Sequence, residues 1–105
     1  MHPDLKVSQD QKILKVLDGQ SSVLVKLTKT TIRGDLSYIV DLTIIHDRFS
    51  NVELIDIGYI SENRIPLSNG QQMVLWEIFD RDGDSAGPPK RKWQDALIQL
   101  IRYFA

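Results

Sequence analysis

The sequence predicts an α+β domain, in which an antiparallel four-stranded meander sheet carries an N-terminal helix and a C-terminal amphipathic helix packed on it. Two observations lead to this prediction. Runs of alternating apolar residues are separated by short turn signals in the middle of the chain, whereas apolar residues recur at helical spacing near its end. A chain of 105 residues can form one compact core and is too short for two. Residues 1–105 are therefore expected to form a single domain.

The first element is predicted as a helix over residues 8–17. It opens with the pattern of a capping box, Ser8-Gln9-Asp10-Gln11, in which the serine hydroxyl and the last glutamine satisfy each other's backbone donors. Three apolar residues, Ile13, Leu14 and Leu17, then fall on one helical face. Gly19 is placed to end the helix. A strand is the alternative, because Asp18-Gly19 between two apolar runs is also a hairpin signal.

Four strands are predicted next, each from alternating or β-branched apolar residues bounded by turn residues. Arg33-Gly34-Asp35 and Asn69-Gly70 supply turns, and residues 61–70 are predicted as a polar connection. Short connections leave no room for a crossover, so neighbouring strands are expected to be antiparallel. Alternation fails near Asp56 to Gly58, which indicates a bulge. The strands are Ser22–Ile32, Leu36–His46, Val52–Ile60 and Gln72–Phe79.

The C-terminal segment is predicted as an amphipathic helix packed on the sheet. Two prolines, Pro88 and Pro89, lie at or just before its first turn, and Asp95 sits near the positive end of the helix dipole. Its apolar residues recur at helical spacing and are expected to be buried: Trp93, Ala96, Leu97, Leu100, Ile101 and Phe104.

Charge and composition exclude several classes of function. The chain has 13 basic and 14 acidic residues, so its net charge of -1 gives no general attraction for nucleic acid. No apolar run approaches the roughly 20 residues that cross a bilayer, and the N-terminus does not resemble a signal peptide. The chain has no cysteine, which excludes disulfides and thiolate chemistry. The sequence predicts a cytoplasmic protein with no membrane contact.

The segment between Trp76 and Trp93 is the best candidate for a site, because connections of this length are uncommon inside compact domains. Three carboxylates alternate in it, as at the start of a calcium loop: Asp80, Asp82 and Asp84. The pattern then fails, since it requires glycine where Ser85 stands and glutamate where Arg91 stands. Neither a metal nor a cofactor is expected.

An enzyme is the less favoured alternative. His46 is followed by Asp47, which could orient it as a general base, and Asp41 lies on the same predicted strand. No serine or cysteine stands in a setting typical of a nucleophile. The sequence therefore predicts a binding protein that is not an enzyme, and small-molecule chemistry through His46 with Asp47 or Asp41 remains the second hypothesis.

Exposed carboxylates are the predicted contact residues, because acidic clusters on a stable scaffold attract a basic partner. Trp76 alternates in phase with Val74 and Ile78 and is expected in the core. A third hypothesis is a subunit that dimerises through an edge strand, such as Val23 to Ile32, and the oligomeric state stays open. The predicted partner-binding residues are Glu77, Asp80, Asp82, Asp84, Asp47, Glu53 and Glu62.

The outline of helix, strand meander and C-terminal helix, together with the acidic loop from Asp80 to Asp84, resembles the immunity proteins of bacterial toxin systems. These include the immunity proteins of contact-dependent growth inhibition. The resemblance implies a small cytoplasmic protein that binds one cognate toxin domain, such as a nuclease, and occludes its active site. The acidic loop would then imitate the charge of phosphates in a basic cleft.

Overall fold

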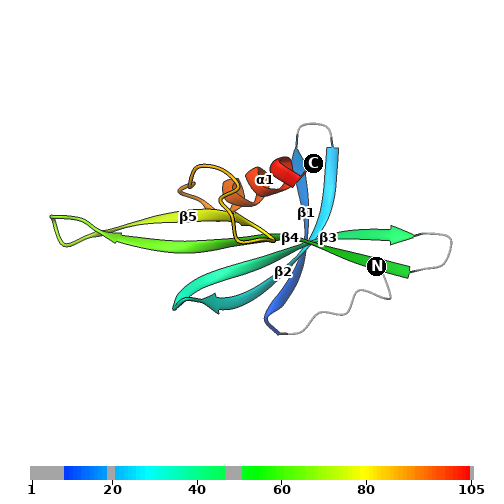
Figure 1. Cartoon of the computed structure of the whole chain (residues 1–105), viewed down its shortest axis with the longest axis horizontal. Coiled ribbons are helices and arrows are strands. Elements are labelled where there is room, and N and C mark those ends of the chain that lie inside the picture. The colour runs from blue at the N-terminus through cyan, green and yellow to red at the C-terminus, as the bar shows by residue number, and fades with distance from the viewer. Residues whose placement is uncertain (1–8, 19–20, 47–50, 105) are drawn as a thin grey trace.

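The computed structural model describes residues 9–18, 21–46 and 51–104, which form one antiparallel sheet of five strands and one helix. The strands follow one another in the order β1-β2-β3-β4-β5, and the curled sheet carries α1 on one side (Figure 1). The predicted α+β class, the meander and the C-terminal helix are confirmed. The elements are β1 Gln11–Asp18, β2 Ser21–Ile32, β3 Asp35–His46, β4 Asn51–Pro66, β5 Gln72–Asp80 and α1 Trp93–Phe104.

The predicted N-terminal helix is wrong, and the strand alternative is correct. Residues Gln11–Asp18 form β1, which pairs antiparallel with β2 from Gln11↔Thr28 to Asp18↔Ser21. A short apolar run fits both periods, and pairing with β2 satisfies the backbone groups of alternate residues while Leu14 and Val16 pack against the core. The count of four strands is therefore also wrong. Ser8, the proposed cap, lies outside the described residues.

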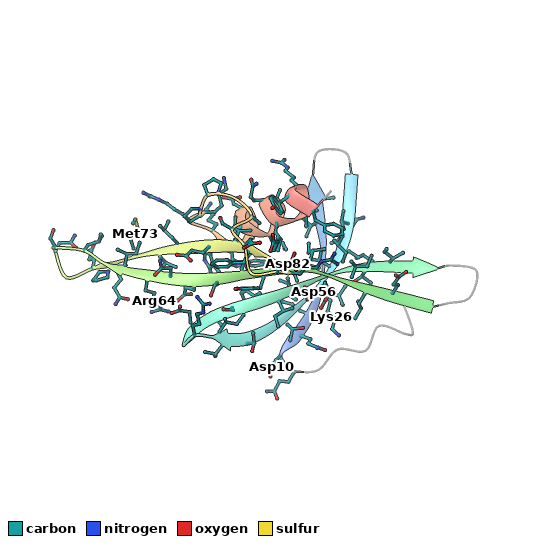
Figure 2. The ribbon with its side chains drawn as sticks, in the orientation of Figure 1. Asp10, Lys26, Asp56, Arg64, Met73 and Asp82 are labelled. Carbon is teal, nitrogen blue, oxygen red and sulfur yellow. The ribbon has the colours of Figure 1, made fainter. Side chains whose placement is uncertain are left out.

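β4 is longer than predicted, because its last residues are polar and do not look like a strand. The predicted polar connection begins at Ser61, but β4 continues to Pro66 and pairs with β5 through Arg64↔Val74. The β4 and β5 strands project from the body of the protein as a two-stranded arm, along which Figure 2 labels Arg64 and Met73. The predicted turn closes the arm, with the Gly70 amide donating to the Leu67 carbonyl at 3.1 Å.

The predicted bulge is present in β4 at Ile57. The register passes from Val40↔Gly58 to Asp41↔Asp56 and leaves Ile57 as the extra residue. Gly58 has a φ of 135°, and its amide donates to Asp56 Oδ1 at 3.0 Å. The bulge inserts Ile57 into the core, where it is 2% exposed.

The core lies between the concave face of the sheet and α1. Trp76 is buried, as predicted, and its ring stacks on Tyr38 with centroids 5.7 Å apart. Trp93 is half-buried, but Phe104 is 43% exposed, so its predicted place in the core is wrong. The other predicted residues of the helical stripe are buried: Ala96, Leu97, Leu100 and Ile101.

Candidate partner-binding site

The end of β5 forms a tight acidic turn, residues 80–84, whose backbone is organised by one carboxylate. Asp80 Oδ1 accepts from the amides of Asp82 at 2.9 Å and Asp84 at 3.0 Å. The Asp80 amide donates to the Asp84 carbonyl at 2.8 Å, and Gly83 accommodates a φ of 86°. Asp80 therefore positions the turn, while Asp82 and Asp84 are exposed to solvent.

A shallow cleft of about 230 Å³ lies between the acidic turn and the end of α1. Asp80, Arg81 and Asp82 line it on one side, and Tyr103 and Phe104 line it on the other. Tyr103 is 52% exposed, so two aromatic rings face solvent beside carboxylates. We name this combination the acidic-aromatic cleft.

The other predicted contact carboxylates do not join this surface. Glu77 accepts from the Asn63 side-chain amide at 2.8 Å across the β4–β5 arm. Glu62 forms an ion pair with Arg64, and its side chain is only 11% exposed. Glu53 is exposed on β4, five residues before the Gly58 that pairs with Asp80. Asp47 lies outside the described residues, so the structure brings together only the three aspartates of the turn.

After the acidic turn, the chain runs back along the outer edge of β5 as a covering segment, residues 84–90. Trp76 and Lys90 exchange two backbone hydrogen bonds of 2.6 and 3.0 Å, and the Ala86 amide donates to the Ile78 carbonyl at 2.9 Å. The long loop therefore has regular pairing of its own. It also separates the basic Lys90-Arg91-Lys92 run from the acidic turn along the strand.

Sequence reasoning finds the acidic turn and misses the aromatic half of the cleft. The helical stripe predicts Phe104 in the core, but residues 102–104 at the end of α1 are exposed, and Phe104 lines the cleft instead. Tyr103 falls off the apolar stripe in the sequence, which is the available signal that an aromatic residue faces outward.

Neither a metal cluster nor a membrane-spanning helix occurs in the described ranges. Within residues 9–18, 21–46 and 51–104, no three His, Asp or Glu side chains are arranged to hold a metal ion. In that same part of the chain no helix has the length and apolar character needed to cross a membrane, since α1 has 12 residues.

Asp41, on β3, is the one residue of the enzyme hypothesis whose side chain the structure describes. Asp47 and the His46 side chain are outside the described part of the structure. The register places Asp41 between Lys26 of β2 and Asp56 of β4, the two neighbours that Figure 2 labels. Burial raises the pKa of Asp41, the negative charge of Asp56 raises it further, and Lys26 opposes both effects.

Replacing Asp41 with asparagine is expected to stabilise the protein at pH 7. A raised pKa means that the folded state holds the Asp41 proton more tightly than the unfolded chain, so the ionised carboxylate lowers stability at neutral pH. The gain in free energy of unfolding from Asp41→Asn should shrink as the pH falls through the raised pKa of Asp41, and it should vanish below about pH 3.9, where the carboxyl is protonated in both the folded and the unfolded chain. Thermal unfolding at several pH values measures this, with the exposed Asp35→Asn as control. A lower melting temperature at pH 7 would contradict it.

The acidic-aromatic cleft thus combines fixed carboxylates, exposed aromatic rings and one arginine, which suits contact with a protein surface.

Comparisons of this chain with family models, with curated proteins and with solved structures found no match.

Proposed function

We propose that this protein acts in the cytoplasm as an immunity protein, which binds a basic toxin domain and covers its active site. The observation that carries the proposal is the acidic-aromatic cleft, in which Asp82 stands beside the exposed rings of Tyr103 and Phe104. No chemical step is assigned to the cleft. Its residues supply charge and apolar contact to a partner.

The charge of the turn favours rapid capture of a basic protein. Asp82 and Asp84 are exposed, and the hydrogen bonds to Asp80 hold them in place before any partner arrives. Carboxylates fixed in this way lose little freedom on binding and attract lysine and arginine side chains over several ångströms. The charge thus affects the association rate more than the final affinity.

The aromatic rings provide the contact that keeps the partner bound. Half-exposed Tyr103 and Phe104 offer apolar area and ring faces that attract a cation. Aromatic residues at the centre of an interface often carry a large share of the binding energy. A lysine or arginine of the toxin can therefore lie between the Asp82 carboxylate and the Tyr103 ring.

A nuclease is the favoured kind of toxin, because its active site must attract phosphates. Such a site presents positive charge, and the carboxylates of the acidic turn can occupy the positions of phosphate groups. Binding there would block access of the nucleic acid to the catalytic groups. The protein itself needs no affinity for nucleic acid.

The test uses the protein encoded by the neighbouring gene as the partner, purified with and without this chain. Asp82→Asn combined with Asp84→Asn is expected to slow association about threefold to tenfold near 0.1 M salt, and far less near 1 M salt, where charges are screened. Stopped-flow fluorescence measures the rate. The double change Asp10→Asn with Asp35→Asn removes the same charge elsewhere and is the matched control.

Inhibition completes the test. One equivalent of this protein should abolish the activity of the neighbouring gene product on nucleic acid, and Tyr103→Ala should raise the dissociation rate. Failure of the two purified proteins to bind, or equal association rates for the two double variants, would count against the proposal.

A further inference from the structure

A second surface, unrelated to the acidic-aromatic cleft, lies between β1 and α1. It is a groove of about 210 Å³ lined mainly by apolar residues. Leu97 forms its floor at 1% exposure, and Leu14 and Val16 of β1 pack against the core, whereas Leu17, which is 66% exposed, shares the other face of β1 with Lys15. The lining residues are Leu14, Lys15, Val16 and Leu17 from β1 and Trp93, Gln94, Leu97 and Ile98 from α1.

One wall of the groove is an open edge of the sheet. The Lys29 amide donates to the Asp10 carbonyl, which makes this pair a hydrogen-bonded pair of the β1–β2 ladder. Bonded pairs alternate along an antiparallel ladder, so Ile13, Lys15 and Leu17 direct their backbone groups away from β2. No described residue pairs with these groups, whereas the covering segment covers the opposite edge of the sheet along β5 from Trp76 to Asp80.

The charge at the groove is positive. Lys15 is the single charged residue of the lining. Lys12 Nζ lies 4.7 Å from the centroid of the Trp93 ring, which forms one end of the groove. β1 carries two lysines, Lys12 and Lys15, and one aspartate, Asp18, so its net charge is positive. Lysine on an edge strand is a common protection against self-association.

We propose that this groove binds an extended segment of a partner protein that alternates apolar and acidic residues. The segment adds a strand to β1, and its backbone bonds to the outward groups of Ile13, Lys15 and Leu17. Its apolar side chains enter the groove between β1 and α1. Leu14 and Val16 face the groove, so the Lys15 side chain projects from the other face of the strand and meets the alternate acidic residues.

The probe is a synthetic peptide, fluorescein-Thr-Val-Glu-Val-Glu-Val-Thr-amide, and its binding to the full chain is followed by fluorescence anisotropy and hydrogen exchange. Binding should slow exchange of the Ile13, Lys15 and Leu17 amides. Lys15→Glu should weaken binding about fivefold, while Lys29→Glu, which reverses a charge farther along the sheet, should have little effect. A peptide with lysines in place of both glutamates should bind more weakly than the probe.

Backbone pairing has its own test. Ile13→Pro removes an outward amide at an edge position and should weaken binding about tenfold or more, with the melting curve as a check of folding. Should that variant unfold, N-methylated forms of the peptide replace it as the test. N-methyl groups on the alternate residues whose amides bond to β1 should abolish binding, whereas N-methyl groups on the residues between them should leave it intact. The Asp82→Asn and Asp84→Asn double variant should bind the peptide normally, which separates this groove from the proposed toxin contact.

Several results would overturn the proposal. They are failure of the probe to bind, equal affinity for the acidic and basic peptides, and unchanged exchange of the Ile13, Lys15 and Leu17 amides. A dimer of the chain that Ile13→Pro dissociates would assign the edge to a second copy. Binding seen only after removal of residues 1–8 would assign it to the chain's own N-terminal segment.

Discussion

Replacing Gly58 with alanine is expected to destabilise the protein by about 2 to 6 kcal/mol. A Cβ atom at this position would lie 2.1 Å from the Phe79 carbonyl oxygen and 2.8 Å from the Asp80 Cα, both backbone atoms of the paired strand. Moving β5 away to relieve that overlap costs about 1 to 3 kcal/mol. The φ of 135° adds about 1 to 3 kcal/mol for a residue other than glycine.

The control is Gly34→Ala, in the turn between β2 and β3. Gly34 also has a positive φ, of 82°, but nothing lies within 4 Å of the position that an alanine Cβ would take, so the loss should be about 1 to 2 kcal/mol. Urea unfolding of both variants measures the difference. Equal losses would show that β4 and β5 separate easily at the bulge. The acidic turn would then be less firmly held than its hydrogen bonds indicate.

The second large effect is expected at Leu100, where substitution by alanine should cost about 2 to 5 kcal/mol. Leu100 is fully buried between α1 and the sheet, and α1 is the one helix of the described chain. Removal of its side chain leaves a cavity between α1 and the strands that it packs against, chiefly β4 and β5. Small domains have a total stability of about 5 to 15 kcal/mol, so this single change removes a large part of it.

Leu67→Ala is the matched control for Leu100→Ala. Leu67 is 42% exposed near the tip of the β4–β5 arm, and its truncation should change stability by about 0.5 kcal/mol or less. Chemical unfolding followed by tryptophan fluorescence measures both variants, since Trp76 and Trp93 report on the core and its margin. A loss at Leu100 as small as that at Leu67 would mean that α1 is not required to hold the curled sheet together.

The sequence predicted the elements whose apolar residues have one clear period. β2, β3, β5 and α1 are of this kind, because each buries one face against a single core. Residues 11–18 are ambiguous in sequence, since eight residues are too few to separate a period of 3.6 from a period of 2. The second half of β4 is hidden for a different reason, because Glu62, Asn63 and Arg64 are three consecutive polar residues in the two-stranded arm and show no apolar alternation.

The site was predictable only where its residues are adjacent in sequence. Asp80, Asp82 and Asp84 stay together because one turn contains them. Glu77 and Glu62 share only their charge with that turn. Glu77 accepts a hydrogen bond from Asn63 across the arm, and Glu62 pairs with Arg64 two residues along β4. The same limit applies to the sheet edge, since the predicted edge strand β2 became internal once β1 paired with it.

The covering segment along β5 has a consequence for assembly. A sheet with two bare margins can extend in both directions and grow into a fibre, as neighbouring molecules dock one after another. Here residues 84–90 cover the edge of β5 from Trp76 to Asp80, so a molecule that docks there meets this segment and not the bare strand beside the core. Stacking of successive molecules through the body of the sheet is thereby blocked on the β5 side.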